Sequence, residues 1–135
     1  MFSKIARNAS RGRWLVVVTL IVTFAIGVRY HELLTAAVTP NPTPPSPESI
    51  NRGRELWRQD CEACHGASGR GDGPISANLQ KQPKDLSKIA PPPVFPDGVV
   101  AYRIANGGEG MPAWKSVLTT DQIWDLINFI RSLKR

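Results

Sequence analysis

The stretch Cys61-Glu62-Ala63-Cys64-His65 governs the interpretation of this sequence. Two thiols stand three positions apart, and an imidazole follows the second thiol directly. The chain has only two cysteines, two histidines and two methionines, so few side chains are available to bind a soft metal. An amphipathic segment at 49–60 precedes the stretch, and a run rich in glycine and proline follows it at 66–96. We therefore look for the chemistry of the chain around these five residues.

Cys-x-x-Cys-His is the attachment pattern of c-type haem, because the two thiols reach the vinyl groups and the imidazole ligates the iron. A structural zinc site normally needs four ligands, and the other histidine, His31, lies in an apolar N-terminal segment. A thioredoxin-like pair follows a strand, whereas this one follows a helical pattern. A plain disulfide stays open as an alternative, although it closes a very small loop. We expect one covalent haem c on Cys61 and Cys64, with His65 as an iron ligand.

The second axial ligand is approached by subtraction. Apart from the first residue, Met111 is the only methionine, and the folded part has no second histidine. Met111 lies in a turn-rich loop, Gly107 to Trp114, whose glycines permit close approach to a flat cofactor. We predict Met111 as the sixth ligand. A lysine ligand, an empty position, or a methionine that merely fills a gap between loops are the alternatives.

The periodicity predicts an all-α chain without a convincing strand. Helices are expected over 49–60, near 75–79, over 97–107 with Asp97 as its cap and Gly107 at its end, and from a capping box at Thr119 onward. Basic residues Arg131, Lys134 and Arg135 suit the negative end of the last helix.

The N-terminus has the layout of an export or membrane signal. Lys4, Arg7, Arg11 and Arg13 precede an uncharged run from Trp14 to Val28, and extension to Leu34 gives a span of about 30 Å. We expect an uncleaved single-pass anchor in the cytoplasmic membrane, with its basic end in the cytoplasm and the rest on the extracytoplasmic side. A signal peptide cleaved near Thr35-Ala36-Ala37 is the alternative.

The chain thus divides into a basic end and anchor at 1–38, a Pro-rich linker at 39–48, and a folded domain at 49–135. The linker has five prolines between Pro40 and Pro47, which favours polyproline II. At about 3.1 Å per residue it would act as a spacer of about 25 Å that lets the domain swing.

Length and charge exclude several function classes. With 135 residues the chain is too short for a multidomain enzyme. Residues 1–40 carry five basic and one acidic side chain, and the remainder carries twelve and ten. The net charge of +6 therefore belongs mainly to the N-terminal segment, and the folded part is not predicted to bind nucleic acid.

These residues give the chain a resemblance to class I monohaem c-type cytochromes with His/Met ligation, of the membrane-anchored bacterial type, over residues 49–135. Gly53 and Trp57 resemble the small and aromatic pair of the family's first helix, and Phe129 resembles the aromatic residue that packs on that glycine. The Gly71 to Pro74 segment resembles the one whose proline carbonyl accepts a hydrogen bond from the proximal imidazole, which gives Pro74 that role toward His65. We also assign Trp114 to the haem wall.

The resemblance implies a cytochrome c fold wrapped around haem and a one-electron carrier rather than an enzyme. A tethered carrier would exchange electrons with membrane complexes, such as a quinol-oxidising complex, a terminal oxidase or a reaction centre, and would have no small-molecule substrate. A fixed haem subunit of a multisubunit oxidoreductase is the alternative. A haem-based ligand sensor is a third hypothesis, which requires an open iron position.

Overall fold

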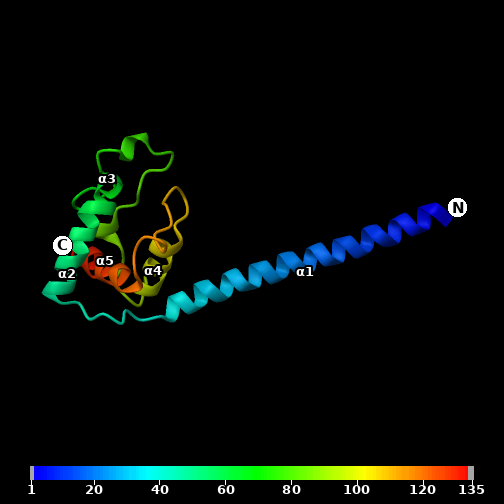
Figure 1. Cartoon of the computed structure of the whole chain (residues 1–135), viewed down its shortest axis with the longest axis horizontal. Coiled ribbons are helices and arrows are strands. Elements are labelled where there is room, and N and C mark those ends of the chain that lie inside the picture. Colours follow the sequence, from blue (N-terminus) through cyan, green and yellow to red (C-terminus); the bar gives the residue numbers. More distant parts are fainter. Residues whose placement is uncertain (1, 134–135) are drawn as a thin grey trace. The chain divides into compact units, whose positions relative to one another are not determined.

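The computed structural model describes residues 2–133, and for 2–12 it describes the backbone alone. Its helices are α1 (Phe2–Val38), α2 (Pro47–Asp60), α3 (Glu62–His65), α4 (Asp97–Asn106) and α5 (Thr120–Ser132), with short 3-10 turns η1 (Ser76–Asn78) and η2 (Leu86–Lys88) (Figure 1). The described residues contain no strand, only an isolated bridge between Gly108 and Met111. The all-α prediction is confirmed.

The chain forms two compact units, one ending at Thr35 and one beginning at Ala36. The first unit is the greater part of α1. Within the described residues, Arg13–Val38 is the one helical stretch long and apolar enough to cross a membrane by length and composition. The hydroxyls of Thr19 and Thr23 donate to the carbonyls of Leu15 and Thr19, at 2.8 and 3.0 Å. These polar side chains are thereby satisfied inside the helix, as an apolar environment requires.

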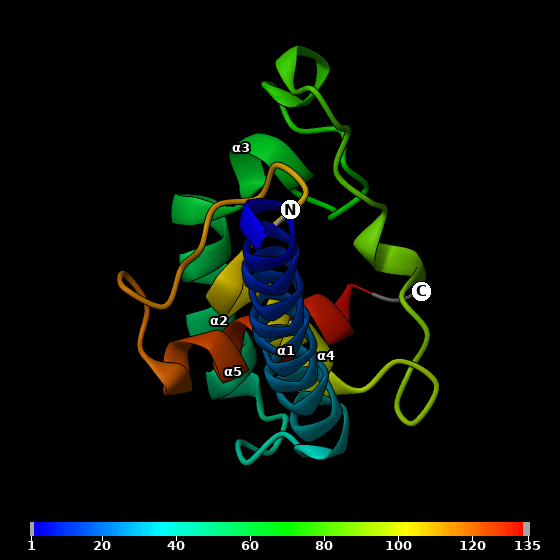
Figure 2. The ribbon, with the colours of Figure 1, turned by 90° about the vertical axis from the view of Figure 1, so that its right-hand side faces the viewer.

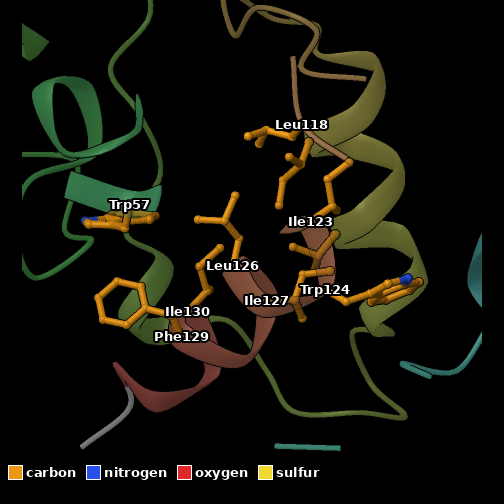
Figure 3. Close-up of a cluster of buried hydrophobic side chains, with 10 residues drawn as sticks. Trp57, Leu118, Ile123, Trp124, Leu126, Ile127, Phe129 and Ile130 are labelled. Carbon is orange, nitrogen blue, oxygen red and sulfur yellow. The ribbon is translucent and has the colours of Figure 1, made fainter. Parts of the chain in front are cut away.

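The second unit is organised by the packing of α2 against α5. Gly53 makes this possible, because a Cβ on it would overlap the carbonyl oxygen of Asp125 and lie 2.9 Å from Cβ of Phe129. One turn further along α2, Trp57 packs on Phe129 with the ring centroids 5.6 Å apart (Figure 3). The small and aromatic pair predicted for this helix therefore lies at the contact with the last helix.

The buried hydrophobic cluster fills the space between α2, α4 and α5 (Figure 3). Eight of its ten residues lie in α2 and α5 or just before α5, and two come from α4. None comes from residues 58–99. The full set is Trp57, Val100, Ile104, Leu118, Ile123, Trp124, Leu126, Ile127, Phe129 and Ile130.

The helix ends show where local prediction holds and where it fails. The capping box of Thr119 and Gln122 at the start of α5 is confirmed, as is Gly107, with φ +67°, after α4. Helix α2 begins two residues before the predicted start, because Ser46 and Ser49 form a capping box. The prediction that Asp97 caps α4 is wrong, since Pro96 occupies that position. Lys134 and Arg135 lie outside the described residues.

The Asp97 carboxylate instead pairs with Arg131 near the end of α5, with Nε 2.7 Å from Oδ1. The other guanidinium nitrogens of Arg131 donate to the carbonyls of Ala90 and Phe95, at 2.7 and 2.6 Å. One half-buried arginine therefore fixes both ends of the Pro-rich loop before α4.

Residues 39–46, here called the strap, do not behave as the free spacer predicted from their prolines. Buried Asn128 of α5 accepts a hydrogen bond from Asn41 at 2.9 Å and donates to the carbonyl of Thr43 at 3.1 Å. Asn128 also donates to Ser49 Oγ at 2.9 Å. The strap belongs to the same compact unit as the helices, so these residues are not a spacer detached from the domain. The reason is a buried amide on α5 that holds the strap from the side.

Candidate functional site

The Cys-x-x-Cys-His stretch begins at Cys61, the residue that joins α2 to α3, and continues through α3 (Glu62–His65). The Cys61 amide completes α2 by donating to the Trp57 carbonyl at 2.9 Å, and the Cys61 carbonyl accepts from Cys64 and His65 at 3.2 and 2.9 Å. The two cysteines and the imidazole therefore lie within one turn of helix. Both cysteines are half-buried free thiols.

The following glycine-rich segment closes over this turn. The Gly71 amide donates to the His65 carbonyl at 2.8 Å, and the Ile75 amide donates to the Ala63 carbonyl at 3.1 Å. A Cβ on Gly73 would lie 2.6 Å from the Glu62 carbonyl oxygen, so only glycine permits this approach. The segment that ends at Pro74 is thereby fixed against the motif. Arg58, Glu62, Ala63 and Pro74 line an open depression of about 460 Å³ on its outer side.

His65 lies half-buried beside Trp57, with the ring centroids 5.6 Å apart. Burial lowers the pKa of His65, which favours the neutral imidazole that ligates metals. The Nδ1 atom is buried and has no hydrogen-bond partner, so the hydrogen bond predicted from His65 to the Pro74 carbonyl is not formed in this structure. A buried polar nitrogen without a partner is costly, and an external group that uses the imidazole would offset that cost.

The Cys61 thiol is in the wrong environment for redox catalysis. Burial raises its pKa to about 12, and the nearby Asp60 and Cys64 add to the effect. A reactive cysteine needs a depressed pKa and a substantial thiolate fraction at neutral pH. The electrostatics therefore disfavour the thioredoxin-like alternative.

The loop that carries Met111 is shaped by backbone conformations rare outside glycine. Gly107, Gly108 and Gly110 have positive φ, and Glu109 adopts φ +54° between them. The amides and carbonyls of Gly108 and Met111 pair with each other at 2.9 and 3.1 Å. The Glu109 carboxylate forms an ion pair with Lys81 from the preceding loop, and the pKa of Glu109 is lowered chiefly by the hydrogen bond from Lys81.

Three of the predicted site residues pack against the hydrophobic cluster. Cys61, Met111 and Trp114 are partly buried there, and His65 contacts the cluster member Trp57. The Trp114 amide donates to the Ile104 carbonyl at 3.1 Å, which fixes the loop to the end of α4. In the part of the chain that is described, no three His, Cys, Asp or Glu side chains gather as a metal-binding group. Two thiols, one imidazole and one thioether form a donor set that fits haem rather than a bare ion.

An all-helical domain of this size, with the haem-attachment motif on the turn between its first two helices, defines the class of c-type cytochromes. The chain belongs to the family described as cytochrome C oxidase, cbb3-type, subunit III, whose profile matches residues 48–130, more than half of the chain. Covalently bound haem c with iron is therefore its cofactor, and electron transfer is its general function.

Two relatives agree with this assignment. Cytochrome c6 of Alaria esculenta is 31% identical over 83 residues, which cover 60% of this chain and 87% of that protein. A chain of the Kuenenia stuttgartiensis reducing HAO-like protein complex matches with a TM-score of 0.63 and 27% identity. That match covers 70% of this chain and 47% of the other, so this chain spans about half the length of that structural relative.

Sequence reasoning missed the polar residues that position the loops around the site. Arg131 and Asn128 lie on the helix predicted to be the most regular, and neither belongs to a motif. Their partners are the Asp97 carboxylate, backbone carbonyls, the Ser49 hydroxyl and the Asn41 side-chain amide, 34 to 87 residues away in sequence. The one available signal was the presence of polar residues within an apolar stretch of helix, which suggested no particular partner.

Proposed function

We propose that this protein is a membrane-tethered monohaem cytochrome c that carries single electrons between membrane redox complexes on the extracytoplasmic side. The observation that carries the proposal is the α2–α3 turn, which presents Cys61, Cys64 and a half-buried His65 within one turn of helix. The general function of the family is electron transfer. The proposal adds the residues of the site and the location of the protein.

Cys61 and Cys64 would hold the haem covalently through thioether bonds, and His65 would ligate the iron on one side. When bound, the haem iron supplies one-electron redox chemistry. Trp57 orients the turn, because its indole Nε1 donates to the Gly66 carbonyl at 3.1 Å while its ring lies against His65. With haem bound, the Pro74 carbonyl would accept a hydrogen bond from His65 Nδ1, which lacks a partner in this structure, and the bonds of Gly71 and Ile75 to the motif hold the segment of Pro74 close to it.

Met111 would be the second axial ligand, which gives the His/Met ligation of class I cytochromes. Its loop is anchored at both ends by the Gly108 pairing and by the bond from Trp114 to Ile104, so little ordering entropy remains to be lost on ligation. A thioether ligand raises the reduction potential and leaves no open position for a substrate. Trp114 would cover one side of the haem.

We further propose that residues 13–38 span the cytoplasmic membrane once, with the basic residues before Trp14 on the cytoplasmic side. The length and composition of the helix and the charge asymmetry support this orientation. A cleaved signal peptide would instead release the haem domain, and N-terminal sequencing of the mature protein separates the two.

The ligand assignment is tested by the absorption spectrum of the reduced holoprotein with and without CO. We expect a sharp c-type spectrum that CO does not change, and we expect Met111→Ala to become CO-reactive and to lower the reduction potential. Val117→Ala, in the exposed turn that follows, is the matched control and should match the parent. A CO-sensitive spectrum of the parent would favour a haem-based ligand sensor over an electron carrier. An unchanged spectrum of Met111→Ala would refute Met111 as the second axial ligand.

A fixed subunit of a multisubunit oxidoreductase is the second candidate. The family description names an oxidase subunit, and the structural relative comes from a protein complex. The two candidates differ in stoichiometry after mild detergent extraction. A fixed subunit co-purifies in constant ratio with its complex, whereas a carrier for a quinol-oxidising complex, a terminal oxidase or a reaction centre elutes alone.

A further inference from the structure

The loop before α4 exposes five consecutive apolar residues, Pro91 to Phe95. Val94 is 77% exposed and Phe95 is 41% exposed. Between residues 39 and 133 the other exposed large hydrophobic residues are Ile75 and Val117, and neither lies in a run of five exposed apolar residues. No charged side chain occurs from Ile89 to Pro96. A rigid, uncharged, exposed apolar patch of this kind marks a surface that contacts a membrane or another protein.

The loop has already satisfied its backbone donors. Four of the residues from 91 to 96 are prolines and have no N–H, and the amides of Val94 and Phe95 both donate to the Pro91 carbonyl, at 3.0 and 3.2 Å. Every amide N–H that the loop possesses is therefore paired within it. Transfer of the loop out of water leaves no unpaired N–H, which removes the main penalty for burying irregular backbone.

Arg131 keeps the loop in this shape without adding a free charge. Its guanidinium bonds the carbonyls of Ala90 and Phe95 and pairs with Asp97, whose side chain is 17% exposed. The positive and negative charges cancel, and the arginine side chain itself is 16% exposed. Because the prolines and the clamp fix the loop beforehand, little conformational entropy is lost when the patch is covered.

The loop lies next to the point where the chain enters the domain. A Cβ on Gly98 would lie 2.7 Å from the Thr39 carbonyl oxygen and would overlap that of Ala36, so the backbones touch there. Gly98 follows Phe95 by three positions, which is at most about 11 Å of chain. Within the domain, Figure 2 shows this loop and the strap toward one end, and η1 at the opposite end.

We propose that Pro91 to Phe95 contact the headgroup layer of the membrane, with Val94 and Phe95 as the inserted side chains. The inference rests on the proposed anchor, because Ala36 and Thr39 lie at the end of the proposed span and touch the start of α4. The contact fixes one orientation of the haem domain on the bilayer. The occupant is lipid rather than protein, since the patch adjoins the point at which the chain leaves the bilayer.

The test uses the full-length holoprotein in vesicles of phosphatidylethanolamine and phosphatidylglycerol that contain a diazirine-bearing phospholipid. After illumination, trypsin separates the peptides 14–29 of the span, 89–103 of the loop and 71–81 of the η1 region, which carries the exposed Ile75. We expect lipid adducts on 14–29 and on 89–103, located at Val94 and Phe95 by fragmentation, and none on 71–81. Val94→Asp should reduce the loop adducts several-fold relative to those of the span.

Val117→Asp is the matched control, because it places the same charge at another valine of similar exposure, 64%. It should leave the loop adducts unchanged. Adducts on 14–29 without adducts on 89–103 would overturn the inference and leave the anchor intact. A lack of adducts on both peptides would overturn the proposed anchor and the inference with it.

Discussion

The two halves of the haem domain are held together in different ways. Helices α2, α4 and α5 supply the buried cluster and pack through apolar side chains, whereas residues 58–99 contribute none of its members. That second half packs only the partly buried Cys61, Leu86 and Ile89 against the cluster, and it is also held by hydrogen bonds and ion pairs, among them those of Arg131 and of the turns around His65. Stability in such a molecule is expected to be lowest where apolar contacts are fewest.

The difference indicates where the cofactor contributes to folding. A small domain with loops this long has little core of its own. We expect haem to supply further apolar surface for the loops, whereas the helix pair has a packed interface without it. Four variants separate these contributions.

Gly53→Val should have the largest effect, because it disrupts the contact between α2 and α5. The new side chain overlaps Asp125 and Phe129, and α2 must move away from α5. We expect a loss of about 3 kcal/mol or more in the free energy of unfolding, or failure to accumulate holoprotein. Thermal denaturation followed by far-UV circular dichroism measures it. Gly27→Val, with open space around its Cα, is the control, and equal losses in both would refute the packing argument.

Arg131→Met should selectively loosen the loop half. It removes three bonds from one half-buried guanidinium and leaves Asp97 without its partner, at a cost of about 2 kcal/mol. We expect the substitution to accelerate amide exchange more at 89–96 than in α2, as measured by hydrogen exchange and mass spectrometry. Arg58→Met, which breaks only an exposed pair with Glu55, should change little. Uniform acceleration across both halves would contradict the distinction between them.

Asn128→Ala should release the strap while the helices stay folded. The change leaves Asn41, the Thr43 carbonyl and Ser49 without their common partner. We expect the free energy of unfolding to fall by about 1 to 2 kcal/mol. The amides of Asn41, Thr43 and Ser46 in the strap should then exchange several times faster than in the parent, measured by hydrogen exchange and mass spectrometry. Asn51→Ala, on the exposed side of α2, keeps the strap in place and serves as the comparison. An equally protected strap in Asn128→Ala would show that other contacts hold it.

Glu109→Gln should have the smallest effect, because its ion pair with Lys81 is exposed. The pKa of Glu109 is lowered below its ordinary value of 4.5, so the pair stabilises the loop at neutral pH and is lost as pH falls below that value. The parent and Glu109→Gln should therefore differ slightly in melting temperature at pH 7 and converge as the pH falls through the lowered pKa of Glu109. A difference in melting temperature that grows on acidification would contradict this prediction. Melting at 1 M salt, which screens the pair, should also remove the difference.

Local patterns predicted the helical half well. The periodic apolar face of α5, its capping box at Thr119 and the glycine after α4 all depend on interactions within four residues, and each is found in the structure. The two cysteines and His65 follow the same logic, since their spacing on one helical turn is local. The small residue at Gly53 was found only through resemblance, because its reason lies on another helix.

The polar half was predicted poorly for a physical reason. Asp97 was expected to cap its own helix, and the strap was expected to extend freely, because sequence patterns weigh only neighbours in the chain. Arg131 and Asn128 offer longer-range partners, and hydrogen bonds to buried or half-buried groups are stronger than exposed caps. A single polar residue in an apolar helix face gives no indication of the segment it will bind.

The docked strap is a part of the chain whose ordering is completed during folding. Asn128 holds it through Asn41 and the Thr43 carbonyl, so the conformational entropy of residues 39–46 is lost once, when the domain folds. A surface that includes the strap is then already ordered when a partner arrives, and association does not include that cost at each encounter.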